Sequence, residues 1–438
     1  AQVAIFLDQI RGHLHHHHPA VREAAVRCLS VDAGEGLTLL IDMLGDPDRD
    51  VVDAAVETLT GRFVADGQDG GRTLLAALDG ASVKQWEGLV GVLSQGDDEL
   101  VEALMPITRQ QLIEAHRARV IVELLTQQGD EDETRLLRDQ LELAIDSARQ
   151  SAVRLLGQLG DVDVVADLME RMGEGDAGAR ENAIELLENI GNPQLLGPLL
   201  PLLTDDVDEQ QQQAWEMSGW QEAGRRIDLD TALRHVLQAS DPWTQMAAGW
   251  TALRLGRPHL LQQLRDQLGE DVPEQVKEIL ELMSDHEHEA EGDQPLTNME
   301  KITFLKGSPF FAALPLEELY HIALAVQEEA AKEGTCVIEQ GSLGDKMYIV
   351  VAGQLEVRIF GGNDTEGSRM AMLSDKQVFG DMTLLDDEPR SASVIAVGDV
   401  RLLSLQRGDL ERILRRYSSI AFSMMRILSR RLREAMAA

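Results

Sequence analysis

Residues 379–394 read FGDMTLLDDEPRSASV and combine a turn glycine, a carboxylate and a single arginine. Gly380 can adopt a positive φ or let a ligand approach the backbone closely. Residues 382–385 are expected to begin a short helix, whose first N–H groups favour an anion. Arg390 offers a forked guanidinium to two phosphate oxygens, and the Asp381 carboxylate can accept a hydrogen bond from a sugar hydroxyl. The stretch therefore predicts a site that binds a sugar phosphate.

This stretch resembles the phosphate-binding cassette of cyclic nucleotide-binding domains, which usually begins with FGE and continues to PR followed by small residues. The resemblance extends through LKGSPFFAALPLEELYHIA at 305–323 and GTCVIEQGSLGDKMYIVVAGQLEV at 334–357, and it covers about residues 300–438. It implies a jelly-roll-like β-roll with flanking helices, in which Arg390 binds the cyclic phosphate and Asp381 binds the ribose 2′-hydroxyl. Asp381 stands where the family usually has Glu, which is one methylene longer.

The ligand implied by this resemblance is cAMP, with cGMP as the alternative. Ser391 does not decide between them, because its hydroxyl can hydrogen-bond either a phosphate or a guanine edge. Gly341, Gly353 and Gly380 also suit the tight turns of a β-roll, whether or not a ligand binds. The residues of the implied binding site are Phe379, Gly380, Asp381, Met382, Thr383, Arg390, Ser391, Ala392 and Ser393.

After Gly408 the sequence continues as an amphipathic helical pattern. Its apolar positions are Ile413, Leu414, Ile420, Met424 and Leu428, and its basic positions are Arg426, Arg430, Arg431 and Arg433. The pattern resembles the lid and dimer helix of the same family, which moves onto the β-roll when the ligand binds. Tyr417 and Phe422 are expected to be core aromatic residues of this helix, and the alternative is that one of them covers the base of the ligand.

A repeat occupies residues 1–283, where segments such as AAVRCL at 24–29 and SAVRLL at 151–156 recur at a mean spacing of 32 residues. The register positions are Leu29, Leu59, Leu93, Leu125, Leu156, Leu187, Ser218 and Leu253. Each repeat is expected to hold two helices separated by a Gly or Asp break. Pro19, Pro47 and Pro242 mark first helical turns, and a capping Asp precedes two of them. The pattern resembles HEAT repeats, which implies an α-solenoid before the α+β domain.

Composition narrows the possible partners. The 438-residue chain has a formal net charge of −36, and residues 1–299 hold 56 acidic and 23 basic side chains. This charge would repel nucleic acid and anionic lipid, so neither is an expected partner. The longest apolar runs are too short to insert this chain into a bilayer. Cys28 and Cys336 are expected to be buried, reduced thiols, which favours a cytoplasmic location.

No catalytic motif stands out, so no enzyme is expected. The four histidines at 15–18 have no fixed ligand geometry, and no native metal site is expected there.

Residues 284–300 are acidic and contain Gly and Pro, as expected for a linker between domains at 1–283 and 301–438. Five tryptophans are expected to pack within or between the repeats: Trp86, Trp215, Trp220, Trp243 and Trp250.

The sequence thus favours a regulator in which cAMP or cGMP changes the contacts of the solenoid with a protein partner. One alternative is a scaffold whose nucleotide domain is vestigial. Another is the soluble tail of a membrane transporter at the inner face of the membrane, because the domain order is similar to the extension of some bacterial nucleotide-translocase-like proteins. VAIFLDQI at 3–10 aligns with the second helix of a repeat, which favours a fragment of a longer polypeptide.

Overall fold

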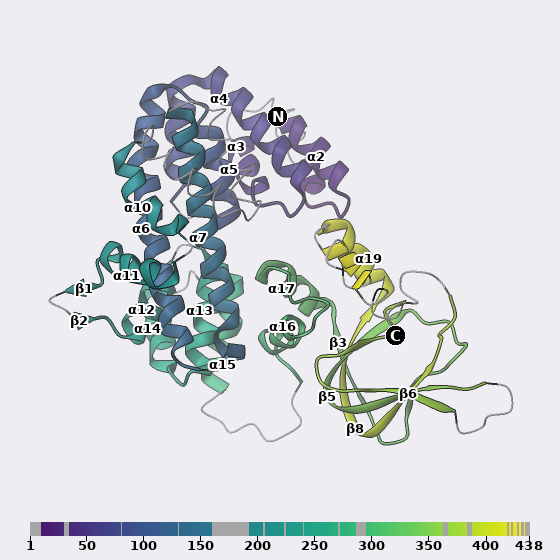
Figure 1. The fold of residues 1–438 in the computed structure, drawn as a ribbon. Coiled ribbons are helices and arrows are strands. Elements are labelled where there is room, and N and C mark those ends of the chain that lie inside the picture. Colours follow the sequence, from purple (N-terminus) through teal and green to yellow (C-terminus); the bar gives the residue numbers. More distant parts are fainter. Residues whose placement is uncertain are drawn as a thin grey trace. The chain divides into compact units, whose positions relative to one another are not determined.

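The chain forms two compact units, Ala1–His288 and Glu289–Ala438, in a computed structural model (Figure 1). The described residues are 10–29, 35–79, 81–129, 131–159, 192–204, 206–222, 225–239, 241–269, 272–285, 295–361, 367–382, 388–417, 420–421, 424–426, 429–430 and 433. Within these ranges, no helix combines the length and the apolar character that are needed to cross a lipid bilayer.

Unit 1, residues 1–288, is built of helices and one short hairpin, which confirms the predicted helical class. Its elements are α2 (Pro19–Cys28), α3 (Glu35–Met43), α4 (Arg49–Ala77), α5 (Val83–Leu93), α6 (Asp98–Thr126), α7 (Glu131–Leu159), α10 (Pro193–Leu203), α11 (Val207–Ser218), β1 (Gln221–Glu222), β2 (Arg225–Arg226), α12 (Leu229–Leu237), α13 (Pro242–Arg254), α14 (Pro258–Leu268) and α15 (Glu274–Asp285). Helices α4, α6 and α7 are each 29 residues long.

The predicted 32-residue register marks the core of unit 1. Leu187 lies outside the described residues, and each of the other seven register positions is at most 5% exposed. Trp86, Trp215 and Trp250 are buried, as expected for packing residues. Trp220 and Trp243 are half-buried. The repeat spacing therefore located buried positions correctly along the whole described part of the unit.

The prediction of two helices in every repeat is wrong in the middle of unit 1. The register steps from Leu93 to Leu125 and from Leu125 to Leu156 each contain one long helix, α6 and α7. Helix α6 contains no glycine, and the only glycine of α7 is Gly157 near its end. Helix α4 even continues through four glycines. A glycine only weakly favours the end of a helix, and tertiary packing can keep the helix continuous through it.

Two of the three prolines that were predicted to mark a first helical turn do begin a helix. Pro19 is the first residue of α2, and Pro242 is the first residue of α13. The third proline, Pro47, lies before α4, and the N-cap of this helix is Asp48. The Asp48 side chain accepts a hydrogen bond from the backbone N–H of Asp50, the second residue of the helix. The preceding Asp46 is buried and pairs instead with Arg22 of α2. The two aspartates of this turn therefore have different structural roles.

Helices from later in the chain pack against α6 and α7. Helices α10, α11 and α12 contact α6, and α13 contacts α7. His116 Nε2 of α6 donates to Pro198 O of α10 at 2.7 Å, and Trp215 Nε1 of α11 donates to Glu123 Oε2 of α6 at 2.8 Å. Unit 1 thus differs from a solenoid in which each repeat contacts only its neighbours. It encloses side chains from helices that are far apart in the sequence.

Unit 2, residues 289–438, contains the β-roll with flanking helices that the sequence implied. Its elements are α16 (Asn298–Gly307), α17 (Leu316–Ala325), β3 (Gln327–Ala331), β4 (Cys336–Ile338), β5 (Lys346–Ile359), β6 (Ser368–Leu373), β7 (Val378–Phe379), β8 (Ser393–Gln406) and α19 (Arg407–Arg416). The antiparallel strand order is β3-β8-β5-β6, with β4 on β8 and β7 on β5. Tyr348, Leu355, Phe379 and Leu402 are among the core residues.

The amphipathic tail is not one continuous helix, because α19 ends before Tyr417, whose φ is −123° and ψ is 85°. Tyr417 is 1% exposed, and its ring stacks on His321 of α17 with a centroid distance of 5.4 Å, so its predicted core role is confirmed. The apolar positions Ile413, Ile420 and Met424 are buried. Leu414 is half-buried, and Arg426, Arg430 and Arg433 are exposed. Phe422, Leu428 and Arg431 lie outside the described residues.

The prediction that the two cysteines are buried is wrong, since both thiols belong to exposed residues. Cys28 is the last residue of α2, and Cys336 is the first residue of β4. Residues at the ends of such elements often face solvent, because the packing neighbours on one side are missing. The cysteines therefore give no argument for a cellular location.

Glu328 of β3 connects the beginning of α16 to the sheet. Its Oε2 accepts from Leu296 N at 2.8 Å, and its Oε1 accepts from Arg401 Nε at 2.9 Å. Burial opposes ionisation of this carboxyl, but these hydrogen bonds and the charge of Arg401 together hold its pKa below the ordinary value. Because the folded pKa is lowered, the stabilisation is present above the ordinary pKa and is lost as pH falls through the lowered value.

We expect Glu328→Gln to remove this acid dependence. At pH 7 the variant should lose about 1 kcal/mol of local stability, and the difference from the wild type should shrink below about pH 4. Amide hydrogen exchange of residues 295–300 and of β3, measured between pH 7 and the acid limit, reports this stability. Glu333→Gln, at an exposed position, is the control. A constant difference between wild type and Glu328→Gln at every pH would contradict the assignment.

Candidate functional site

The predicted cassette begins where β7 ends. Phe379 pairs with Tyr348 of β5, and their rings stack with a centroid distance of 5.2 Å inside the core. Gly380 then adopts a φ of +74°, which confirms the positive φ expected from the sequence. A Cβ at Gly380 would lie 2.9 Å from Ile338 Cδ1 and 2.6 Å from Arg390 Nη1. Both the backbone conformation and the lack of space therefore require glycine here.

Arg390 points into the β-roll and is 7% exposed. Its Nη1 donates to Gly380 O at 2.7 Å, and its Nη2 donates to Lys346 O at 2.5 Å. Its backbone is also held, because Arg390 N donates to Ser342 O at 2.9 Å and Gly341 N donates to Arg390 O at 2.8 Å. Two backbone carbonyls thus hold the guanidinium, and two further backbone hydrogen bonds hold the main chain of Arg390.

Gly344, which the sequence did not single out, makes room for the guanidinium. A Cβ on Gly344 would lie 2.1 Å from Arg390 Nε and 2.3 Å from Arg390 Cζ. No side chain can replace the glycine hydrogen unless the arginine moves. In the sequence, Gly344 is visible as a turn glycine in the LGD triplet at 343–345, before β5. The sequence did not show that this turn lies against Arg390.

The charge of Arg390 is not neutralised by a neighbouring acid within the described residues. Burial lowers its pKa, and the negative charges of Asp345 and Asp381 partly oppose this effect. An arginine nevertheless stays protonated in a protein. No described carboxylate lies within the 4.0 Å ion-pair limit of this guanidinium. The two carbonyls that accept from it are neutral, so the site keeps a buried positive charge.

The other predicted site residues occupy different environments. Asp381 is 5% exposed and lies close enough to influence the charge of Arg390. Ser393 is buried, and its Oγ accepts from Gln340 N at 2.9 Å. Ala392 is half-buried, whereas Ser391 and Met382 are exposed. Thr383 lies outside the described residues, as does most of the short helix expected at 382–385.

Comparisons with known proteins find a family match within each unit. The cyclic nucleotide-binding domain family matches residues 328–417, and the HEAT repeats match residues 134–218. The chain is 38% identical to the cyclic AMP receptor protein of Thermus thermophilus over 135 residues, which cover 30% of this chain and 60% of that protein. It is 33% identical to the cAMP-dependent protein kinase regulatory subunit of Yarrowia lipolytica over 111 residues, which cover 25% of this chain and 28% of that protein.

Among solved structures, the regulatory domain of Toxoplasma gondii PKA with cAMP is 26% identical, with a TM-score of 0.28, and the alignment covers 31% of this chain and 50% of that chain. The two family models thus match HEAT repeats in unit 1 and, later in the chain, a cyclic nucleotide-binding domain in unit 2. The chain spans less than two thirds of the length of either curated relative. The names of these relatives describe a receptor and a regulatory subunit.

Proposed function

We propose that this protein is a cyclic nucleotide sensor, in which cAMP or cGMP bound in unit 2 modulates the interactions of the HEAT-repeat unit with a protein partner. The supporting observation is the inward-facing Arg390, which carries a buried charge without a described carboxylate partner. An uncompensated buried charge is costly. A cyclic phosphate, which carries a single negative charge, would neutralise it through charge-assisted hydrogen bonds.

The family resemblance suggests how the other residues contribute. Arg390 has five N–H donors and directs two of them to carbonyls, so it can still bind phosphate oxygens. Asp381 accepts the ribose 2′-hydroxyl, and its negative charge disfavours a second charge on the phosphate. The backbone at Gly380 and the segment 391–393 complete the site. Phe379 supports the site from the core, since its ring is stacked on Tyr348.

A short backbone path connects this site to α19. Lys346 O accepts from Arg390, and the adjacent Asp345 O accepts from Arg407 N, the first residue of α19, at 2.7 Å. A phosphate that draws Arg390 away from Lys346 O would disturb the start of β5, to which α19 is attached. Ligand binding is therefore expected to shift the populations of α19 positions. This shift is the proposed signal to a partner of unit 1.

Titration of the full chain with cAMP and with cGMP tests the proposal. Isothermal titration calorimetry is expected to show saturable binding of one nucleotide per chain. The open-chain 5′-AMP should bind more weakly, because its phosphate carries more negative charge beside Asp381. Hydrogen exchange of α19 and of unit 1 should change when the nucleotide binds. Flat titrations with both cyclic nucleotides would instead indicate a structural, vestigial domain.

A further inference from the structure

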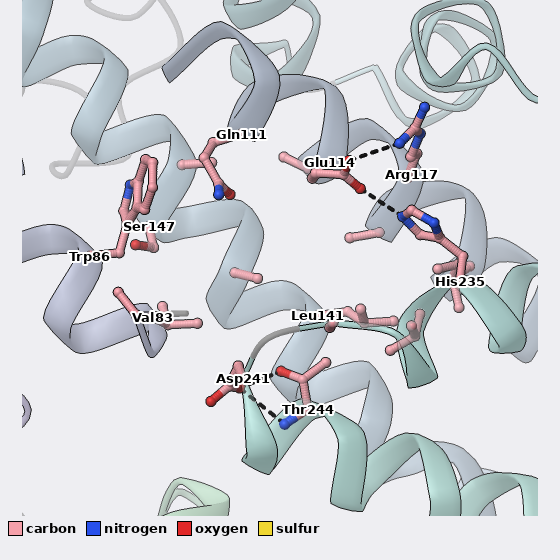
Figure 2. A pocket seen from close by; sticks show the side chains of 18 of the residues that line it. Val83, Trp86, Gln111, Glu114, Arg117, Leu141, Ser147, His235, Asp241 and Thr244 are labelled. Atoms are coloured by element: carbon pink, nitrogen blue, oxygen red, sulfur yellow. Dashed lines mark hydrogen bonds and ion pairs between the residues drawn. The ribbon is translucent and has the colours of Figure 1, made fainter. Parts of the chain in front are cut away.

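Unit 1 contains a cavity of about 430 Å³ between helices α5, α6, α7, α12 and α13 (Figure 2). This volume lies in the range of small-molecule sites, which are about 300–1,000 Å³. Part of the wall consists of buried aliphatic side chains from helices that are distant in the sequence, among them Leu78, Ile121, Leu141 and Val236. These side chains can bury the hydrocarbon body of a ligand.

The charged side chains of the lining make the cavity negative. The described residues that line it include the carboxylates Asp79, Glu114 and Asp241, the guanidinium of Arg117 and the imidazole of His235. Three negative charges against one positive charge leave a net charge of −2 with a neutral imidazole, and −1 with a protonated one. In either state of the histidine, the cavity disfavours an anion and favours a cation.

Glu114 is compensated within the wall of the cavity. Its Oε2 accepts from His235 Nε2 at 2.7 Å, and its Oε1 accepts from Arg117 Nη1 at 2.7 Å. Burial opposes ionisation of this carboxyl, but these contacts hold its pKa below the ordinary value. Figure 2 shows the three side chains directed toward one another, with Asp241 apart from them. The negative charge that remains for a ligand therefore belongs to Asp79 and Asp241.

These two aspartates come from two different turns. Asp79 follows α4 and is exposed, and its side chain makes no hydrogen bond or ion pair among the described residues. Because Asp79 both lines the cavity and is exposed, it lies where the cavity meets solvent. Asp241 is the N-cap of α13, and its Oδ2 accepts from Thr244 N at 3.0 Å and from Thr244 Oγ1 at 2.5 Å. Both of these donors are neutral, so they leave the charge of Asp241 in place.

The wider charge of the helical unit acts in the same direction. Residues 1–299, which include unit 1, hold 56 acidic and 23 basic side chains. Such a surplus raises the local concentration of cations, and salt screens the effect. The aliphatic wall adds a second requirement, because only a cation that carries a hydrocarbon body gains from both the charge and the apolar surface. A metal ion has no such body, whereas an organic ammonium does.

We propose that this cavity binds an organic amine, whose protonated ammonium group is attracted by Asp79 and Asp241 and whose apolar body packs on the aliphatic wall. An ammonium group has only donors, which suits a carboxylate. The site differs from the cyclic nucleotide site in its residues and in the sign of its ligand's charge. It gives the HEAT-repeat unit a ligand of its own.

Dansylcadaverine, a naphthalene sulfonamide with a primary amine at the end of an alkyl chain, is a suitable probe for the full chain. All five tryptophans lie in unit 1, so energy transfer from tryptophan to the dansyl group reports binding in that unit. The control probe is dansyl butylamide, which keeps the dansyl group and an alkyl chain but lacks the ammonium. We expect saturable transfer with dansylcadaverine and about three- to tenfold weaker binding of the butylamide.

Added salt should weaken the binding of dansylcadaverine and leave that of the butylamide unchanged. Equal affinities for the two probes would overturn the assignment of an amine. The absence of saturable transfer with dansylcadaverine would overturn the proposal as a whole.

The double variant Asp79→Asn/Asp241→Asn should weaken dansylcadaverine binding about three- to tenfold and leave butylamide binding unchanged. Asparagine still caps α13, so the fold is preserved. Asp98→Asn/Asp208→Asn is the matched control, because it removes two exposed aspartates from the first turns of α6 and α11, outside the cavity. Ala144→Phe narrows the cavity and should weaken both probes at least tenfold, with circular dichroism confirming that the variant folds. Equal losses in the two double variants would show only non-specific attraction to an acidic surface and would overturn the proposal.

Discussion

Replacing Arg390 with alanine is expected to weaken cyclic nucleotide binding by about 2–5 kcal/mol, which raises Kd about 30-fold or more. The guanidinium is the buried positive group of the proposed site, and its two carbonyl contacts hold it inside the β-roll. Isothermal titration with cAMP measures the loss. Arg415→Ala, on the exposed side of α19, removes the same charge elsewhere and should leave Kd unchanged. A Kd within threefold of the wild type for Arg390→Ala would exclude the assigned phosphate contact.

Gly344→Ala should produce a comparable loss although the arginine is still present. The added Cβ would lie 2.1 Å from Arg390 Nε, so the guanidinium must leave its position. Gly361→Ala is the matched control, because a Cβ there meets nothing within 4 Å. Thermal unfolding of both variants would verify that the domain folds. Normal affinity in Gly344→Ala would mean that the observed position of Arg390 is not needed for binding.

The cassette could be proposed from the sequence because the residues assigned to it lie close together in the chain. Arg390, Asp381 and Gly380 lie within one turn-rich segment, and the positive φ of Gly380 follows from the chemistry of turns. Gly344 was not predictable in the same way. Its role depends on a contact with Arg390 that exists only after β5 and β8 have paired. A glycine in a turn does not reveal what lies against it.

In unit 1 the sequence predicted burial better than helix continuity. An apolar residue recurs at every register position except Ser218, because these positions enter the core, so the period was visible without a structure. Whether a helix ends at a glycine depends on the packing around it, as α4 shows.

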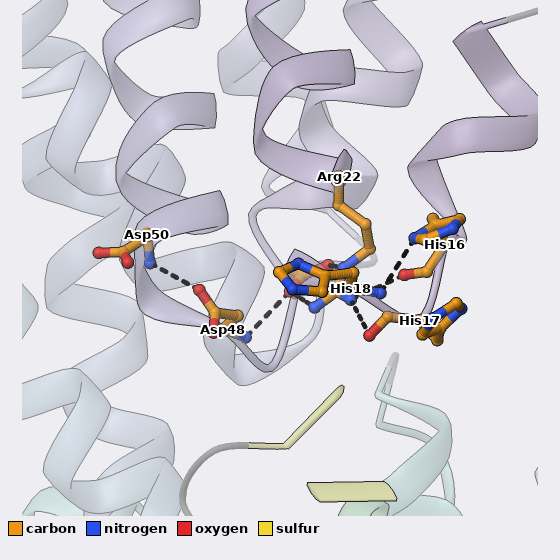
Figure 3. A network of polar contacts seen from close by, with 7 residues as sticks. His16, His17, His18, Arg22, Asp48 and Asp50 are labelled. Carbon is orange, nitrogen blue, oxygen red and sulfur yellow. Dashed lines mark hydrogen bonds and ion pairs between the residues drawn. The ribbon is translucent and has the colours of Figure 1, made fainter. Parts of the chain in front are cut away.

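Replacing Asp46 with alanine is expected to destabilise unit 1 by about 3–5 kcal/mol, because it leaves the buried charge of Arg22 unpaired. The two side chains form a forked pair, with Nε–Oδ2 and Nη2–Oδ1 distances of 2.8 Å. Arg22 lies beside His16 and His17 (Figure 3). Arg22 is 0% exposed and also donates to His16 O at 2.8 Å. Asp46 accepts in addition from Asp48 N at 2.9 Å, so its loss also affects the turn before α4.

Urea unfolding followed by tryptophan fluorescence measures this effect in unit 1, which holds all the tryptophans. Glu57→Ala is the matched control, because Glu57 pairs with Arg27 between the same two helices, α2 and α4, but the side chains are 70% and 50% exposed. Exposed pairs contribute about 0–1 kcal/mol. The double variant Arg22→Met/Asp46→Ala should recover much of the lost stability, since no unpaired charge remains buried. If Asp46→Ala and Glu57→Ala destabilised the unit equally, the buried pair would not be what holds α2 against the turn before α4.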